Sequence, residues 1–165
     1  MNIEEFKASE KIPLIVVLDD VRSMYNVGSI FRTSDAFRVE GVWLCGITAQ
    51  PPHPEIHKTA LGAEESVEWQ YFESTQAALT TLKKSDFIVY SIEQCEGSNL
   101  LQNITIEKGQ KYAIILGNEV KGVKQEIVDQ CDGCIEIPQF GTKHSLNVAS
   151  TAGIVIWEFA KQMIV

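Results

Sequence analysis

The sequence lacks any segment that would send the chain into a membrane or out of the cell. Residues 1–11 have neither a basic start nor an apolar stretch, so they do not form a secretory signal. The most apolar long segment, residues 147–165, contains Ser150, Thr151 and Glu158, which is typical of a buried helix rather than a membrane span. We therefore expect a cytoplasmic protein with no membrane partner.

Positive charge is scarce as well. The 165 residues contain 14 Lys and Arg against 22 Asp and Glu, for a net charge of -8, so the chain has no long-range attraction toward a phosphate backbone. Any nucleic-acid partner must be held by local contacts. Hydrophobic residues make up 45% and charged residues 22%, which is typical of a folded domain, and the length is enough for one core. We expect a single domain over residues 1–165.

The common nucleotide-binding motifs are absent too. No G-x-G-x-x-G occurs, which removes the main sequence support for a dinucleotide site. The glycine-rich segment 117–122 (GNEVKG) lacks the spacing of a P-loop, and the acidic Glu119 would repel a triphosphate.

Metal-binding patterns are equally poor. Cys131 and Cys134 form a C-x-x-C that runs from a predicted helix into a strand, the reverse of a thioredoxin site, and a zinc site would need two further clustered ligands. His53 and His57 do not have the H-E-x-x-H order of zinc proteases and are interpreted as a surface pair at a helix start. We expect no metal, and we interpret the four cysteines as structural or incidental.

Short apolar runs alternate with amphipathic stretches along the chain. This pattern predicts an α/β fold, with a mainly parallel sheet and helices on both faces. The predicted strands are residues 14–18, 42–45, 87–91, 112–116 and 134–137, with 67–72 as a possible sixth. The predicted helices cover residues 27–37, 53–61, 75–84, 124–130 and 147–163, with Asn26, Ser74 and Asn147 as caps and Pro54 in a first turn.

Three polar segments follow predicted strands, where open α/β sheets place their ligands. In the first, residues 19–32, Asn26, Ser29 and Arg32 lie three apart, close to one helical face, so an amide and a guanidinium would project together. The alternative is a capped surface helix whose Arg32 is solvated or paired with Asp35 or Asp19.

The second and third polar segments are loops. Residues 116–123 combine two glycines with Glu119, which could accept hydrogen bonds from an amine, a hydroxyl or an Arg; the alternative is a simple turn. Residues 137–150 open the last helix, whose first amides are unsatisfied and favour electron-rich ligand atoms. Here helix capping alone could explain Ser145 and Asn147.

Taken together, the three segments carry three motifs in matching order and spacing. They are N-x-G-x-x-x-R at Asn26, Gly28 and Arg32; G-N-E-x-x-G at Gly117, Asn118, Glu119 and Gly122; and an Ile137-Pro138 pair followed by S-L-N-V-A at residues 145–149. The set resembles the signature motifs of the SpoU/TrmH family, in the SPOUT superfamily of RNA methyltransferases. The resemblance spans about residues 14–159.

The resemblance implies a function and a topology. Proteins of this family transfer a methyl group from S-adenosylmethionine to a ribose 2′-hydroxyl of tRNA or rRNA. Their cofactor sits in an α/β-knot, a deep trefoil knot near the C-terminus, held by loop groups that correspond here to Gly117, Asn118, Ile137, Ser145 and Leu146. The knot is implied by the family alone, since generic topology rules argue against one.

The resemblance also implies catalytic roles. Arg32 would stabilise the developing alkoxide or anchor the adjoining phosphate, because a guanidinium holds its proton too tightly to act as a base. Asn26 would orient Arg32 or the ribose, and Glu119 would bind Arg32 or the cofactor's amino group. Ser145 and Asn147 would shape the donor pocket.

Family members are typically homodimers in which this Arg serves the cofactor of the other subunit. The apolar residues of the last helix are expected to serve both a core and a partner; they are Val148, Ala152, Val155, Ile156 and Phe159. Trp43, Trp69 and Trp157 are interpreted as core or dimer aromatics.

Structured RNA is the expected substrate, with tRNA favoured over rRNA. The acidic balance suggests a helper protein or a local basic patch made by Arg22, Arg38, Lys58, Lys83, Lys84 and Lys143. Two alternatives stay open: a non-catalytic relative that binds RNA or cofactor, and a different cofactor-using enzyme with a doubly wound sheet.

Overall fold

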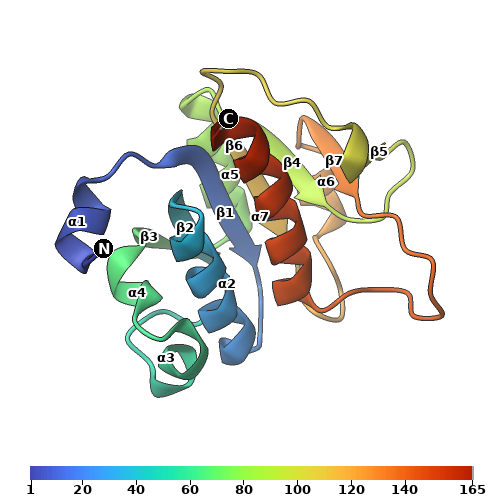
Figure 1. The fold of residues 1–165 in the computed structure, drawn as a ribbon. Helices are drawn as coiled ribbons and strands as arrows, with labels where there is room; N and C mark the ends of the chain where they lie inside the picture. The colour runs from blue at the N-terminus through green and yellow to red at the C-terminus, as the bar shows by residue number, and fades with distance from the viewer. Residues whose placement is uncertain (165) are drawn as a thin grey trace.

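Seven strands form one sheet in the computed structural model, which describes residues 1–164 (Figure 1). The strands are β1 (Ile12–Asp19), β2 (Val39–Cys45), β3 (Trp69–Phe72), β4 (Ile88–Ile92), β5 (Asn99–Leu100), β6 (Tyr112–Leu116) and β7 (Gly133–Glu136). Their order across the sheet is β3-β2-β1-β6-β4-β7-β5, and each neighbouring pair is parallel. The predicted parallel α/β sheet is confirmed.

The apolar runs located the strands well. Each of the five predicted strands and the possible sixth overlaps an observed one, and β6 has the predicted bounds. The strand that the prediction missed is β5, which has only two residues, both exposed, and therefore leaves no apolar pattern in the sequence.

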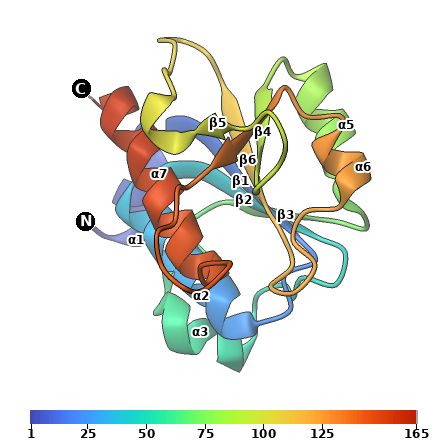
Figure 2. The ribbon, with the colours of Figure 1, turned by 90° about the vertical axis from the view of Figure 1, so that its right-hand side faces the viewer.

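Helices cover both faces of the sheet. They are α1 (Ile3–Ala8), α2 (Met24–Ala36), α3 (Pro54–Ala60), α4 (Ala63–Ser66), α5 (Thr75–Lys84), α6 (Gln125–Val128) and α7 (Val148–Ile164), with a 3-10 turn at Leu101–Asn103. Figure 2 shows α5 and α6 on one side of the sheet and α7 and α1 on the other. The core is divided in the same way, with one apolar cluster on each face.

Short helices account for the elements that the prediction omitted. Helix α4 has four residues and follows a left-handed turn at Leu61 and Gly62, so no full helical period is visible in the sequence. Helix α1 did leave a sequence signal, because Asn2 and Glu5 form a capping box at its start.

One predicted cap is wrong. Helix α2 begins earlier than expected because Ser23 is its N-cap, and the Ser23 side chain accepts a hydrogen bond from the Asn26 N–H at 3.2 Å. Asn26 therefore lies in the first turn, with its side chain free for other contacts. The predicted caps at Ser74 and Asn147 and the first-turn Pro54 are confirmed.

Helix α7 has 17 residues and packs one face on the sheet. All five residues expected to serve both the core and a partner are buried in the core, with Val148 the most exposed at 8%. The expectation of a shared role is wrong for them; the large apolar side chains that α7 exposes are Ile154, Trp157 and Ile164. Within residues 1–164 no helix is both long and apolar enough to cross a membrane.

The strand order places the polar segments together. From β1 the chain adds β2 and then β3 on one side of the sheet. The later strands β6, β4, β7 and β5 all lie on the other side of β1, so the order reverses between β1 and β6. Ligand sites of open α/β sheets lie at such a reversal, at the carboxyl ends of the strands. Residues 20–32 follow β1 and residues 117–124 follow β6, which brings both to this edge.

Candidate active site

A cavity of about 570 Å³ opens at the carboxyl edge of the sheet. Its lining comes from the ends of β4 and β6, from the loop after β6, and from the segment that joins β7 to α7. All five residues expected to bind the cofactor line it: Gly117, Asn118, Ile137, Ser145 and Leu146. We call this space the carboxyl-edge cavity.

The loop after β6 folds back on itself to form one wall of the cavity. Asn118 and Gly122 exchange two backbone hydrogen bonds, of 3.2 and 2.9 Å, and the Asn118 Oδ1 accepts bonds from the N–H groups of Val120 and Lys121. Position 117 requires glycine, because a Cβ there would overlap the backbone of Gly122 and Val123. The glycines of the second motif therefore shape the loop.

Glu119 joins this loop to the segment after β1. Its carboxylate accepts hydrogen bonds of 3.0 Å from the N–H groups of Arg22 and Ser23, and a longer one of 3.4 Å from the Asn26 Nδ2. Partial burial would raise the pKa of Glu119, but these bonds outweigh it and lower the pKa below its ordinary value. Within the single subunit, Glu119 binds Asn26 and makes no contact with Arg32.

Asn26 connects Glu119 to the start of α7. The Asn147 Nδ2 donates to the Asn26 Oδ1 at 3.3 Å, while the Asn147 Oδ1 accepts bonds from the N–H groups of Ala149 and Ser150. Glu119, Asn26 and Asn147 thus form a continuous chain of hydrogen bonds, although 93 residues separate the first two and 121 the last two. The structure brings one residue from each motif together at the cavity mouth.

Arg32 lies apart from this chain. Its side chain is exposed on α2, is not part of the cavity lining, and makes no hydrogen bond or ion pair with residues 1–164. Its suggested partners are otherwise engaged: Asp35 accepts a hydrogen bond from Ser66, and the buried Asp19 accepts one from Thr75. Within the part of the chain described, Arg32 is solvated and its charge is unpaired.

Gly28 has a structural role that the sequence did not indicate. A Cβ at this position would overlap the Ile56 carbonyl oxygen and the Thr59 hydroxyl, because α2 and α3 cross in direct backbone contact. The Thr59 hydroxyl donates to the Tyr25 carbonyl at 2.8 Å across the same contact. The glycine of the first motif therefore sets the position of α2 and of Arg32.

The sequence analysis gave no role to the acidic pair Asp19 and Asp20, which joins the end of β1 to the segment after β6. Lys124, after the second loop, forms ion pairs with Asp20 at 2.9 Å and with Asp19 at 3.4 Å. Burial would raise the pKa of Asp20, but the hydrogen bond and charge of Lys124 outweigh it and lower that pKa. The Asp19-Asp20 pair at a strand end was the available signal.

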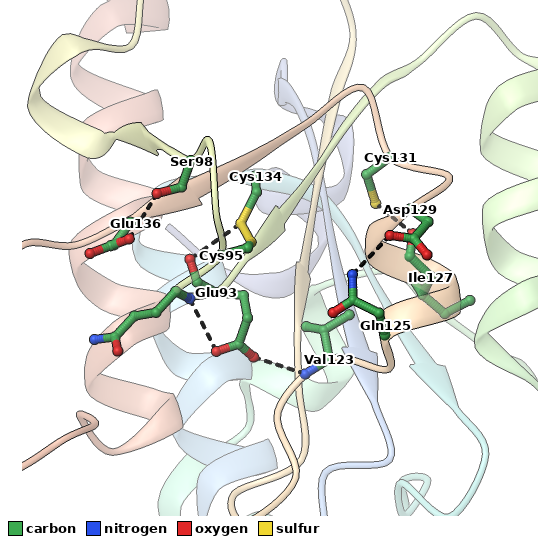
Figure 3. Close-up of a disulfide and its surroundings, with 11 residues drawn as sticks. Glu93, Cys95, Ser98, Val123, Gln125, Ile127, Asp129, Cys131, Cys134 and Glu136 are labelled. Atoms are coloured by element: carbon green, nitrogen blue, oxygen red, sulfur yellow. Dashed lines mark hydrogen bonds between the residues drawn. A yellow bond between two sulfur atoms is a disulfide. The ribbon is translucent and has the colours of Figure 1, made fainter.

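Cys95 and Cys134 form a disulfide beside the cavity (Figure 3). Their separation of 39 residues gave no sign of this pairing in the sequence. Burial raises the pKa of the Cys45 thiol to about 12 and that of Cys131 to about 11, which leaves both as unreactive thiols. Residues 1–164 contain no cluster of three or more His, Cys, Asp or Glu that could hold a metal ion.

The expected basic patch does not assemble around the cavity. Arg38 immediately precedes β2, and Lys83 and Lys84 end α5 shortly before β4, so all three lie at the amino edge of the sheet. The cavity is at the opposite edge, where Arg22 and Lys143 lie in the segments around it. The prediction of one patch is wrong because helices of an α/β unit return the chain to the other edge.

The fold and the cavity define a class of protein: an α/β protein with a ligand cavity built from the loops at the carboxyl edge of a parallel sheet. A family model described as the SpoU rRNA Methylase family matches residues 13–157. The chain belongs to this family, which confirms the resemblance seen in the motifs.

Individual relatives agree with this assignment. An uncharacterized tRNA/rRNA methyltransferase of Borreliella burgdorferi is 31% identical over 98% of this chain and 69% of its own length. Among solved structures, an AdoMet-bound rRNA methyltransferase from Sinorhizobium meliloti is 26% identical, with a TM-score of 0.85 over 98% of this chain and 60% of that one. A TrmH/SpoU tRNA modifying enzyme from A. aeolicus is 25% identical, with a TM-score of 0.84 over 97% of this chain and 80% of that one.

Proposed function

We propose that this chain transfers a methyl group from S-adenosylmethionine to a ribose 2′-hydroxyl of structured RNA. The observation that carries the proposal is the hydrogen-bonded chain of Glu119, Asn26 and Asn147, which gathers all three motifs at the mouth of one cavity. The residues belong to loops at the carboxyl edge of the sheet, where a bound ligand and a second reactant can meet. The proposed unit is one catalytic domain over residues 1–165, of which residue 165 lies outside those described.

The carboxyl-edge cavity suits the proposed cofactor, which the Sinorhizobium relative binds. Ile137 and Leu146 offer apolar walls for an adenine ring, and the backbone of Gly117 lines the same cavity. Ser145 and Asn147 add polar groups where the lining meets α7. When bound, the cofactor supplies an electrophilic methyl group on a sulfonium.

Arg32 supplies the electrostatic part of the mechanism. A ribose hydroxyl is a weak nucleophile at neutral pH, so negative charge on its oxygen must be stabilised as it attacks the methyl carbon. The exposed guanidinium of Arg32 can face that oxygen or the adjoining phosphate without first breaking an ion pair. The proton of the hydroxyl leaves through the phosphate or water, because Arg32 keeps its own proton.

A homodimer would bring Arg32 to a cavity. Because Arg32 does not line the cavity of its own subunit, we propose that it serves the cavity of a second copy. Trp157, 51% exposed, packs against Phe37 with 5.5 Å between the ring centres, so apolar surface lies where α7 meets α2, the helix of Arg32. The exposed Ile154 extends this surface. A deep trefoil knot in the segments that line the cavity is part of the same proposal.

Transfer RNA is the favoured substrate and rRNA the alternative. The net charge of -8 requires that RNA be held by local cations such as Arg22 and Lys143, or by a helper protein. Calorimetry with S-adenosylhomocysteine and a radiolabelled methyl-transfer assay on bulk tRNA and rRNA test the function. Binding with transfer supports the proposal, binding without transfer indicates a non-catalytic relative, and the absence of both contradicts it.

A further inference from the structure

One wall of the carboxyl-edge cavity comes from a segment outside the three motifs. This wall is the end of β4, where Ile92, Glu93 and Gln94 line the cavity. Of these, Glu93 reaches across to the loop after β6: its Oε2 accepts a hydrogen bond of 3.0 Å from the Val123 N–H (Figure 3). A carboxylate from one wall therefore holds the backbone of another.

The loop after β6 is shaped around this carboxylate. Gly122 has a φ of +69°, and a Cβ at that position would overlap the Glu93 carboxylate. Val123 is buried, at 6% exposed, so without Glu93 its N–H would lose its partner in a place that is poorly accessible to water. Glu93 thus fixes the end of the same loop whose beginning, at Gly117 and Asn118, lines the cavity.

Glu93 is in turn held against β7. Its N–H donates to the Ile135 carbonyl at 3.1 Å, and two residues further on Cys95 is joined to Cys134 by the disulfide. Ile135 itself lines the cavity. In Figure 3 the disulfide, the Glu93 side chain and Val123 lie one after another, from one wall to the next. The covalent link limits how far the segment carrying Glu93 can move from β7.

We propose that Glu93 is a positioning residue of the cofactor cavity and that the Cys95–Cys134 disulfide keeps it in place. Opening the bridge then weakens cofactor binding while leaving the transfer step unchanged. This inference rests on the proposed function of the cavity. Opening requires a dithiol: its two thiols are oxidised to a disulfide, and the bridge gains two electrons and two protons to become two thiols.

Substitutions at Glu93 test the positioning role. We expect Glu93→Ala to weaken binding of S-adenosylhomocysteine, and to raise the KM for S-adenosylmethionine, by about tenfold or more, while kcat at saturating cofactor stays within about twofold. Glu93→Gln keeps an oxygen for the Val123 N–H and should recover most of the affinity. Glu96→Ala, at an exposed position on the same segment, is the matched control and should bind like wild type.

Opening the bridge should have the same effect. We expect reduced wild type and the Cys95→Ser variant to bind S-adenosylhomocysteine more weakly by a similar factor, and reoxidation to restore the wild type only. Cys131→Ser, which removes a thiol outside the bridge, is the control and should respond to dithiol as wild type does.

Three results would overturn the inference: wild-type affinity in Glu93→Ala, no recovery in Glu93→Gln, or equal affinity in the oxidised and reduced protein. Oxidised wild type that binds no S-adenosylhomocysteine would overturn the proposed function of the cavity, and this inference with it.

Discussion

The side chains of Asn26 and Asn147 share a hydrogen bond of 3.3 Å although they stand 121 residues apart in the chain. The same Asn26 side chain donates to Glu119, so one amide bridges two loops that together frame the cavity mouth. An amide is suited to this position because it can donate to a carboxylate and accept from a second amide at once. The alignment of the three segments therefore depends on Asn26.

Replacement of Asn26 should loosen that alignment. We expect Asn26→Ala to lower methyl transfer by about tenfold, because both side-chain bonds are lost, and to cost no more than about 1 kcal/mol in stability, since the site is at the surface. Steady-state transfer assays and urea denaturation measure the two effects. Asn103→Ala, at an exposed position in the 3-10 turn, should change neither. Full activity in Asn26→Ala would show that the bridge is dispensable.

The charge of Arg32 should matter for chemistry and not for cofactor binding. We expect Arg32→Ala to lower transfer by at least about a hundredfold, the scale for removing one preorganised charge-stabilising group, with nearly unchanged calorimetric affinity for S-adenosylhomocysteine. The matched control is Arg38→Asn, because asparagine tolerates the φ of 52° at that position. Turnover like that of wild type in Arg32→Ala would remove Arg32 from the mechanism.

Mixed dimers should show which subunit supplies Arg32. Gly117→Ala should be inactive because its Cβ overlaps the loop that lines the cavity, and Arg32→Ala should be inactive for the reason above. Coexpressed in equal amounts, the two variants should regain about a quarter of wild-type activity, since half of the dimers are mixed and each mixed dimer has one complete site. No recovery, with mixed dimers verified by mass spectrometry, would place Arg32 in its own subunit's site.

The close crossing of α2 and α3 should make Gly28 sensitive to any side chain. We expect Gly28→Ala to destabilise the protein by about 1–3 kcal/mol, because the added methyl group overlaps the backbone of Ile56. Gly153→Ala, in α7, meets open space and should stabilise the helix by about 0.5–1 kcal/mol. Chemical denaturation compares the two variants; equal effects would contradict the packing argument.

The sequence predicted the elements that have strong local patterns. Buried parallel strands such as β6 are continuous apolar runs, so their positions could be read from the chain, and the three motifs located the loops that line the cavity. The partner of Glu119 could not be predicted, because it depends on α2 beginning at Met24 and not one turn later.

The other features that the sequence analysis did not predict depend on tertiary contacts between distant segments. The Cys95–Cys134 pairing arises because β4 and β7 are neighbours in the sheet, which no local pattern records. The same holds for Glu93, whose role depends on the loop after β6 approaching the end of β4.

The position of the transferred methyl group tests the central claim most directly. RNA incubated with the protein and S-adenosylmethionine labelled in its methyl group should be digested to nucleosides and analysed by mass spectrometry. We predict that the label resides on the ribose 2′-oxygen, at a site resistant to alkaline cleavage, and that Arg32→Ala removes it. Label on a base, or no label from a protein that binds S-adenosylhomocysteine, would contradict the account.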